Sequence, residues 1–346
     1  MIFDEFHERS LASDEALALV LEAQRILRPD LRIIIMSATI DTDEICGKLG
    51  APLIEGKGRM FPVDLRYAQK DIDLKNPGEE VARCVFAAHR DNEGDILAFL
   101  PGEAGIRRCA ELLEGNLGGT RIFPLYGMLP KEEQRRAIAP SRPGERKVVL
   151  ATSIAETSLT IEGVRVVVDS GLCRKMIFDR RNGMSHLETV RISIDMADQR
   201  SGRAGRTAPG VCYRLWTAGT MQRMQACRTP EISDCDLAPL RLDIAAWGES
   251  DIMNLPWITP PPKENVIQAE SLLRSLGAID VNGRITKHGR AMSALPCHPR
   301  IAQMLLRADT PELRSLATDI AAILEERDPM PQDNDADLRT RVNALR

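Results

Sequence analysis

The sequence has little of what marks secreted, membrane-spanning or zinc-stabilised proteins. Its eight cysteines are scattered and none belongs to a C-x-x-C pair, so we expect reduced thiols rather than a disulfide framework or a zinc site. No run reaches the roughly 18 apolar residues of a membrane-spanning helix, and no signal-peptide pattern precedes Asp4. These absences predict a cytoplasmic protein without a membrane partner.

A strong charge of one sign and a large aromatic content are also missing. The formal net charge is −4 over 346 residues, and aromatic residues make up 4% of the chain. The charge neither supports nor excludes a nucleic-acid partner, because a local groove can be basic on an acidic protein. The hydrophobic content of 43% can fill more than one core, and the length suggests two or three domains.

Strand and helix patterns alternate along much of the chain. Apolar runs occur at "DILAFLPG", "TRIFPLYG", "KVVLAT" and "VRVVVDSG", with helical stretches such as "EAGIRRCAELLEG" between them. This alternation predicts an α/β fold with a doubly wound parallel sheet, in which ligands bind at the carboxyl ends of the strands. The earlier run Ile33–Met36 is typical of a parallel strand that is buried on both faces.

Two short motifs follow apolar runs near the start of the chain. In "MIFDEFHERS", Asp4 could hold Mg²⁺ while Glu5 orients an attacking water, with His7 as a polar link. A bare Asp-Glu pair is more often surface charge, so the specificity lies in the longer motif. In "SAT", Ser37 and Thr39 could couple a nucleotide site to a neighbouring lobe. By itself that tripeptide favours a simple turn with capping hydroxyls.

Two later motifs could hold phosphates. The stretch "ATSIAETSLTIEGVRVVVDSG" (151–171) places six hydroxyls beside two strand ends, where hydroxyls and backbone amides can bind nucleotide or nucleic-acid phosphates. In "QRSGRAGR" (199–206), Arg203 and Arg206 share one helix face and could act as arginine fingers. A solvated basic face would explain these arginines. It would not explain Gly202 and Gly205, which each cost about 1 kcal/mol in a helix relative to alanine. These glycines would allow another segment to approach closely.

A predicted β-hairpin covers residues 171–190. The "RNG" turn signal lies between β-compatible flanks with basic character. The hairpin could act as a strand-separating wedge or a nucleic-acid contact, or it could be an ordinary surface hairpin, and the sequence leaves both open.

The order of these motifs resembles that of the DEAH-box helicases of superfamily 2, above all their bacterial HrpB-type members. The resemblance implies two RecA-like lobes that clamp ATP, followed by a winged-helix domain and a helical ratchet domain. It implies the following division: part of the first lobe at 1–58, the second lobe at 59–217, the winged helix at 218–297 and the start of the ratchet at 298–346.

The resemblance also implies roles for individual residues. Asp4 and Glu5 would hold Mg²⁺ and activate water, with His7 completing the box, while Ser37 and Thr39 would couple hydrolysis to movement. The residues expected to meet nucleic acid are Thr152, Glu156 and Thr157. The residues expected to bind or sense the nucleotide are Ser158, Thr160, Glu162, Gly202 and Gly205. Those expected to reach the γ-phosphate are Gln199, Arg203 and Arg206.

The sequence departs from the family pattern in several places. The box reads DEFH, Ser153 stands where the family often has Asn, and Ile138 lies near the place of a base-stacking aromatic residue. No G-x-x-x-x-G-K-[ST] phosphate loop occurs in the chain. The chain therefore looks like a helicase cut at the acidic box, and we expect it to hydrolyse ATP negligibly by itself.

The function predicted from this pattern is that of a helicase that uses ATP and Mg²⁺ and acts on single-stranded nucleic acid, with RNA favoured over DNA. Two other classes stay open, namely a non-catalytic nucleic-acid-binding module and a P-loop ATPase that remodels protein. Polarity, physiological substrate and oligomeric state are not determined by the sequence.

Overall fold

The computed structural model describes residues 1–38, 42–56, 58, 60–142, 144–156, 160–326, 328–330 and 335–346. The chain forms two compact units. The first comprises Met1–Ser13, Leu31–Ile177 and His186–Pro230, and the second comprises Asp14–Asp30, Phe178–Ser185 and Glu231–Arg346. These units cut across the boundary expected at residue 58, and the four-part domain division stays a prediction.

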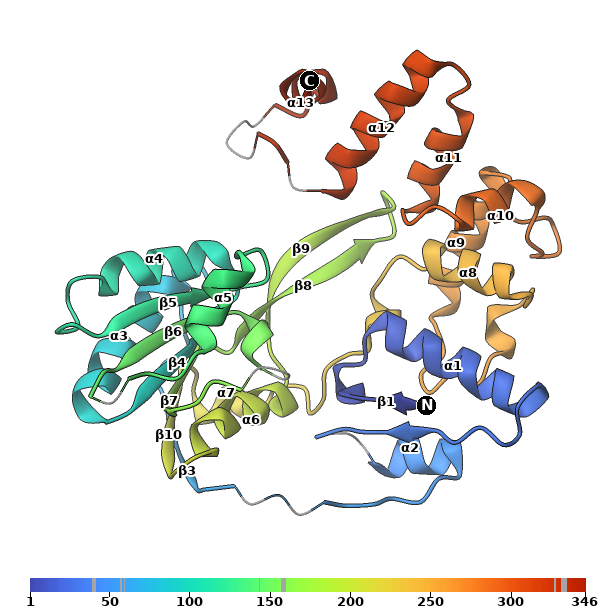
Figure 1. Cartoon of the computed structure of the whole chain (residues 1–346). Helices are drawn as coiled ribbons and strands as arrows, with labels where there is room; N and C mark the ends of the chain where they lie inside the picture. Colours follow the sequence, from blue (N-terminus) through green and yellow to red (C-terminus); the bar gives the residue numbers. More distant parts are fainter. Residues whose placement is uncertain are drawn as a thin grey trace. The chain divides into compact units, whose positions relative to one another are not determined.

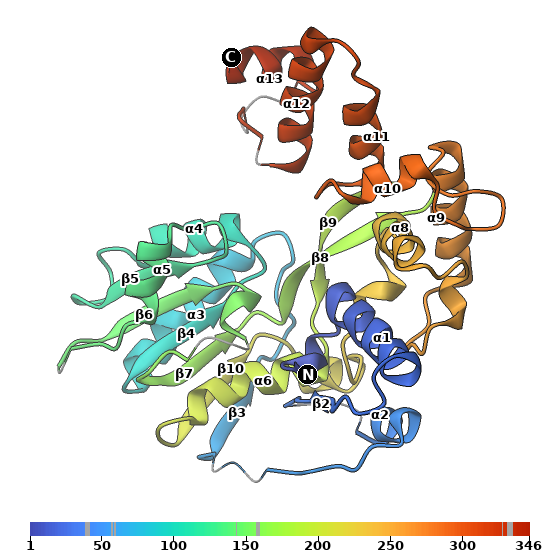
Figure 2. The same cartoon turned by 45° about the vertical axis from the view of Figure 1, so that its right-hand side comes forward.

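A six-stranded sheet forms the core of the first unit (Figures 1 and 2). Its strand order is β3-β10-β7-β4-β6-β5, and every neighbouring pair is parallel. The strands are β3 (Val63–Tyr67), β4 (Asp95–Phe99), β5 (Arg121–Leu125), β6 (Lys147–Ala151), β7 (Val164–Asp169) and β10 (Gly210–Arg214). The parallel α/β fold is therefore confirmed, including the four strands predicted from apolar runs.

Helices cover the sheet because alternate strand residues face opposite sides. Ile96 and Ala98 of β4 pack into a core with α3 (Pro77–Asp91) and α4 (Glu103–Leu113). Leu97 and Phe99 pack into a second core with α5 (Lys131–Ile138) and the short helix η3 (Arg203–Gly205). The period of two along a strand thus gives the central strands two apolar faces.

The burial predicted for Ile33–Met36 is wrong. Only Ile34–Ile35 form a strand, β2, which pairs in parallel with β1 (Ile2–Phe3). Ile34 is 53% exposed and Met36 is 41% exposed. Within the described part of the chain, β2 belongs to a sheet of only two strands, and Ile35 is only partly buried. Helix α2 (Thr42–Leu49) follows it.

The predicted hairpin is present as β8 (Leu172–Asp179) and β9 (Met184–Arg191), which form a two-stranded sheet. Gly183 in the turn has a φ of +67°, a value that suits glycine. The side chain of Asn182 accepts a hydrogen bond from the backbone N–H of Met184 at 2.8 Å. The hairpin is therefore a real element, and its role as a wedge stays a prediction.

The second unit is helical. Residues from four of its helices share one apolar core: Leu242, Leu273, Met292 and Ala302. Its helices are α8 (Ala238–Trp247), α9 (Lys263–Ser275), α10 (Lys287–Ser293), α11 (Pro299–Arg307), α12 (Pro311–Glu325), α13 (Leu338–Leu345) and most of α1 (Leu11–Ile26). An antiparallel bridge joins Ile279 to Ile285 between α9 and α10. Within the described residues, no helix combines the length and apolar composition needed to cross a bilayer.

Candidate functional site

The acidic motif forms a tight turn directly after β1. Glu5 has a φ of +51°, a left-handed conformation that is uncommon for residues other than glycine. Its backbone N–H donates to Asp4 Oδ1 at 2.8 Å. Left-handed residues of this kind cluster at functional sites, where the surroundings hold a conformation that is costly elsewhere. The turn thus agrees with a specialised role for the pair.

His7 connects this turn to the segment after β2. It is only 3% exposed, and its Nδ1 accepts a hydrogen bond from the backbone N–H of Ala38 at 3.4 Å. Nε2 then carries the proton of the neutral ring, and it lies 3.4 Å from Glu5 Oε2. Burial lowers the pKa of His7, and nearby Arg228 lowers it further, while Glu5 acts in the opposite direction. The acidic box and the SAT segment are therefore in contact.

The coupling residues themselves are less well defined by the structure. Ser37 is exposed in the loop after β2, and Thr39 lies outside the described residues. The coupling role of both residues stays a prediction.

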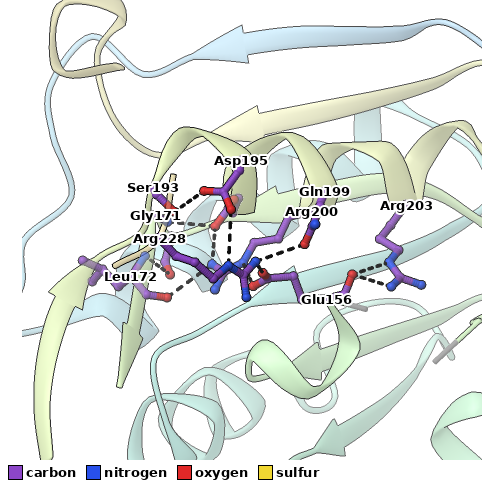
Figure 3. Close-up of polar contacts among 11 residues, drawn as sticks. Glu156, Gly171, Leu172, Ser193, Asp195, Gln199, Arg200, Arg203 and Arg228 are labelled. Atoms are coloured by element: carbon purple, nitrogen blue, oxygen red, sulfur yellow. Dashed lines mark hydrogen bonds and ion pairs between the residues drawn. The ribbon is translucent and has the colours of Figure 1, made fainter. Parts of the chain in front are cut away.

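A buried ion network joins the two motifs that were predicted to bind phosphate (Figure 3). Arg200 in α6 (Ile194–Gly202) donates from Nε to Glu156 at 3.1 Å and from Nη1 to Asp169 at 2.9 Å. All three side chains are almost completely buried. Burial alone would lower the pKa of Arg200, but the two carboxylates outweigh it and raise the pKa. The network fixes α6 to the end of β7.

Arg228 extends this network from a segment well beyond the motifs. Its Nη2 donates to Glu156 Oε1 at 2.7 Å and to Gln199 Oε1 at 3.2 Å, and its Nε lies 3.3 Å from Asp195 Oδ2. Figure 3 shows Gln199, Arg200 and Arg203 on the same helical segment, with Arg228 across from them. Glu156 is therefore held by two guanidinium groups at once.

The two expected arginine fingers each contact the 151–171 stretch. Arg203 donates from Nε to the backbone carbonyl of Glu156 at 3.0 Å, and Arg206 donates from Nη1 to Thr160 Oγ1 at 2.8 Å. Burial and the charge of Arg206 lower the pKa of Arg203 to about 10, while Glu5 opposes this shift. Partial burial also lowers the pKa of Arg206, against the influence of Glu5. Two neighbouring guanidinium groups with lowered pKa values form a place where a bound anion would relieve repulsion.

The structure corrects the predicted position of the candidate nucleotide-binding residues on the sheet. Thr152 follows β6 at the carboxyl edge, as expected. Thr160 and Glu162, however, precede β7, and Arg206 precedes β10, so these three lie at the amino edge of the sheet. The expectation that the polar groups collect at carboxyl ends is thus wrong for the nucleotide candidates, because the motif crosses the sheet between β6 and β7.

Glu156 follows the short helix after β6, in the segment that leads from β6 towards β7. Thr157 and Ser158 lie outside the described residues. Glu156 is 3% exposed, and its carboxylate is engaged by Arg200 and Arg228. Contact of this carboxylate with nucleic acid would require the network to open, and the role stays a prediction.

The glycines of "QRSGRAGR" allow a close approach of backbone to the start of the sheet. A Cβ on Gly205 would lie 2.5 Å from the carbonyl oxygen of Phe61, and one on Gly202 would lie 3.0 Å from Met60 Cε. The close approach inferred from the sequence is therefore present. The nucleotide-binding roles assigned to these two glycines stay predictions.

We expect Gly205→Ala to destabilise the protein by about 1–3 kcal/mol, because the added methyl group overlaps backbone that cannot rotate away. Urea unfolding followed by circular dichroism would measure the change. Gly47→Ala in helix α2 is the matched control, since a Cβ at that position would have no described atom within 4 Å. Equal midpoints for both variants would contradict the packing role of Gly205.

Magnesium binding fits the acidic pair only together with a phosphate ligand. Among the described residues, no group of three or more His, Cys, Asp or Glu side chains could hold a metal ion. Mg²⁺ commonly takes one or two carboxylates and completes its shell with water and substrate phosphates. Asp4 and Glu5 satisfy that smaller requirement.

Sequence reasoning missed part of the network. Arg200 lies inside the arginine-rich motif and could have been singled out as a third arginine in "QRSGRAGR". Asp169 ends an apolar strand in "VVVDSG", which is a weaker signal. Arg228 and Asp195 carry no local signal, because their importance comes from contacts with residues that are distant in sequence.

Comparisons with known proteins agree with this geometry. The family "Helicase conserved C-terminal domain" matches residues 79–208, and "Helicase associated domain (HA2), winged-helix" matches residues 269–297. The ATP-dependent RNA helicase HrpB of Escherichia coli is 44% identical over 94% of this chain. The chain belongs to the DEAH-box helicase family. The crystal structure of the E. coli DEAH/RHA helicase HrpB matches 99% of the chain with a TM-score of 0.91 and 42% identity.

Two yeast proteins named as RNA helicases are also similar. The pre-mRNA-splicing factor ATP-dependent RNA helicase prp22 of Schizosaccharomyces pombe is 38% identical over 88% of this chain. The probable ATP-dependent RNA helicase DHR2 of Saccharomyces cerevisiae is 35% identical over 97% of it. The chain spans 40% of HrpB, 27% of prp22, 47% of DHR2 and 43% of the HrpB crystal-structure chain. It thus covers less than half the length of each.

Proposed function

We propose that this chain acts in an ATP-dependent RNA helicase that couples NTP hydrolysis to movement along single-stranded RNA. The observation that carries the proposal is the meeting of its two phosphate-binding motifs. Arg203 and Arg206 of the 199–206 motif are held by Glu156 and Thr160 of the 151–171 stretch. These hydrogen bonds would couple a change at one motif to the other. A cytoplasmic location remains part of this proposal.

The amino edge of the sheet would receive the nucleotide. Arg203 and Arg206 would stabilise charge that develops on the γ-phosphate, with Gln199 on the same helical segment. Asp4 and Glu5 would hold Mg²⁺, which supplies charge neutralisation on the phosphates when bound. Glu5 would orient the attacking water, and His7 would keep that carboxylate connected to the SAT segment.

The carboxyl edge of the sheet would receive the RNA backbone. Thr152 lies at the end of β6, and its backbone N–H is already used by the carbonyl of Leu125 at 3.1 Å, so its hydroxyl is the group offered to a phosphate. Because hydroxyl contacts to phosphates carry no base information, this mode predicts weak dependence on RNA sequence. Thr157 would contribute in the same way.

Two other functions are separated from this one by simple assays. A non-catalytic RNA-binding module would bind RNA but would not hydrolyse ATP in any context that supplies a phosphate loop. A protein-remodelling ATPase would hydrolyse ATP without stimulation by RNA. The winged-helix match at residues 269–297 favours a nucleic-acid partner over a protein one.

We expect the chain to bind single-stranded RNA weakly, with an affinity that falls steeply with salt and varies little with sequence. Fluorescence anisotropy with labelled poly(U) and mixed-sequence oligonucleotides at low and at roughly physiological salt would measure this. Thr152→Val should weaken binding at both salt concentrations, whereas Thr318→Val in α12, whose hydroxyl donates to the carbonyl of Arg314 at 2.8 Å, is the matched control. Binding that ignores salt, or that depends strongly on base identity, would contradict the backbone-directed mode.

A further inference from the structure

A basic pocket lies at the amino ends of β5 and β6, apart from the residues discussed so far. Its volume is about 200 Å³, and its charged lining consists of five basic side chains and one acidic one. These are Arg121, Arg136, Arg142, Arg146, Lys147 and Glu145. A net lining charge of +4 is unusual on a chain whose formal net charge is −4.

Local structure explains only part of this concentration of charge. Lys147 donates from Nζ to the carbonyl of Ala137 at 2.9 Å, and Arg146 donates to the carbonyls of Gly94 and His89 at 3.0 Å. The contacts with Ala137 and His89 hold the carboxyl-terminal ends of α5 and α3, where cations are favoured. The guanidinium carbon of Arg121 lies 4.8 Å from the ring centre of Phe123. These contacts leave Arg136 and Arg142 without a structural role in the pocket lining.

One guanidinium nitrogen in the pocket lining lacks a partner. Arg146 Nη2 is buried and makes no hydrogen bond in the described structure. A buried donor without an acceptor costs about 1–3 kcal/mol. Because this nitrogen is closed off from solvent, an anion in the open pocket would meet the charge of Arg146 without contacting Nη2 directly.

The remaining arginines are available at the rim. Arg136 Nε lies 3.6 Å from Glu132 Oε1, and Arg121 Nη1 lies 4.0 Å from Glu145 Oε2. More than half of each arginine side chain is exposed. Exposed ion pairs at these distances contribute little to the stability of the fold. Arg142 is exposed, and within the described residues it has no ion pair. One guanidinium group can donate two parallel hydrogen bonds to two oxygen atoms of a phosphate.

We propose that this pocket binds a phosphate group, separately from the candidate nucleotide site. The pocket lies at β5 and β6, and β6 is two strands away from β7 in the sheet order. With adjacent strands about 4.8 Å apart, it lies on the order of 10 Å along the sheet from the Thr160–Arg206 contact. The phosphate could belong to a free polyphosphate or to a nucleic-acid backbone, since both present the same oxygen atoms to the arginines.

The test uses the full chain in an Arg206→Ala background, so that the candidate nucleotide site contributes less to the signal. Isothermal titration would be made with pyrophosphate and, in a second arm, with a single-stranded RNA lacking terminal phosphates. Adding Arg136→Ala and Arg142→Ala should weaken binding about tenfold or more, equivalent to about 1.4 kcal/mol. The matched control adds Arg83→Ala and Arg107→Ala, which remove two exposed arginines with side chains 68% and 63% accessible.

Loss of pyrophosphate binding in the pocket variant, but not in the control, would identify a free polyphosphate as the ligand. Loss confined to RNA binding would identify the nucleic-acid backbone. Equal affinities for the pocket and control variants, or no measurable binding of either probe, would overturn the proposal. Far-ultraviolet circular dichroism of each variant would confirm that the exposed substitutions leave the fold unchanged.

Discussion

Replacing Arg206 by alanine should slow ATP hydrolysis by about 10³-fold, the low end of the range for arginine fingers. The measurement requires a fusion in which an upstream half-lobe with a phosphate loop, taken from a close relative, precedes this chain, because the 346 residues contain no G-x-x-x-x-G-K-[ST] motif. Arg206 contacts Thr160 at 2.8 Å and lies close enough to Glu5 for its pKa to respond. Removing it would leave γ-phosphate charge uncompensated in the transition state.

The same fusion tests the acidic box. Glu5→Gln should abolish turnover and leave ATP binding largely intact, whereas Arg83→Ala on the exposed face of α3 should change neither. Phosphate release would be followed with and without single-stranded RNA. Robust hydrolysis by the unfused chain would reject our interpretation of the missing loop, and normal turnover by the Glu5→Gln fusion would reject the role assigned to the opening motif.

Arg200→Met should destabilise the protein by about 3–5 kcal/mol, since removing one partner leaves uncompensated buried charge. Glu156 and Asp169 are 3% and 0% exposed and would both lose a guanidinium partner. Denaturant unfolding monitored by tryptophan fluorescence would report the loss, because Trp216 is fully buried in the same unit.

Two further variants separate charge from packing at Arg200. Arg107→Met, on an exposed pair with Glu103, should cost less than about 1 kcal/mol. Combining Arg200→Met with Glu156→Gln and Asp169→Asn should recover part of the lost stability. In this triple variant, neutral amides replace the two buried carboxylates that would otherwise lack the guanidinium group of Arg200. A triple variant less stable than Arg200→Met alone would show that volume, rather than charge, controls this site.

Several features followed from local sequence because their causes are local. β4 and β6 were predicted from apolar runs, and every residue in each strand is buried. The glycines at 202 and 205 predicted a close approach because they weaken a helix without any other benefit, and backbone atoms do lie against Gly205. The edge strand β3 escaped this reasoning, since four of its five residues are exposed and its pattern is mixed.

The sequence by itself determined the α/β class, the order of the motifs and the residue types available for phosphate chemistry. Only the tertiary structure decided that Arg228 and Arg200 both hold Glu156, and that Thr160 and Arg206 meet at the amino edge of the sheet. The physical reason is the range of the forces involved. Apolar periodicity is a property of neighbouring residues, whereas a buried ion network forms only when folding brings charges 31 to 72 residues apart within hydrogen-bond distance.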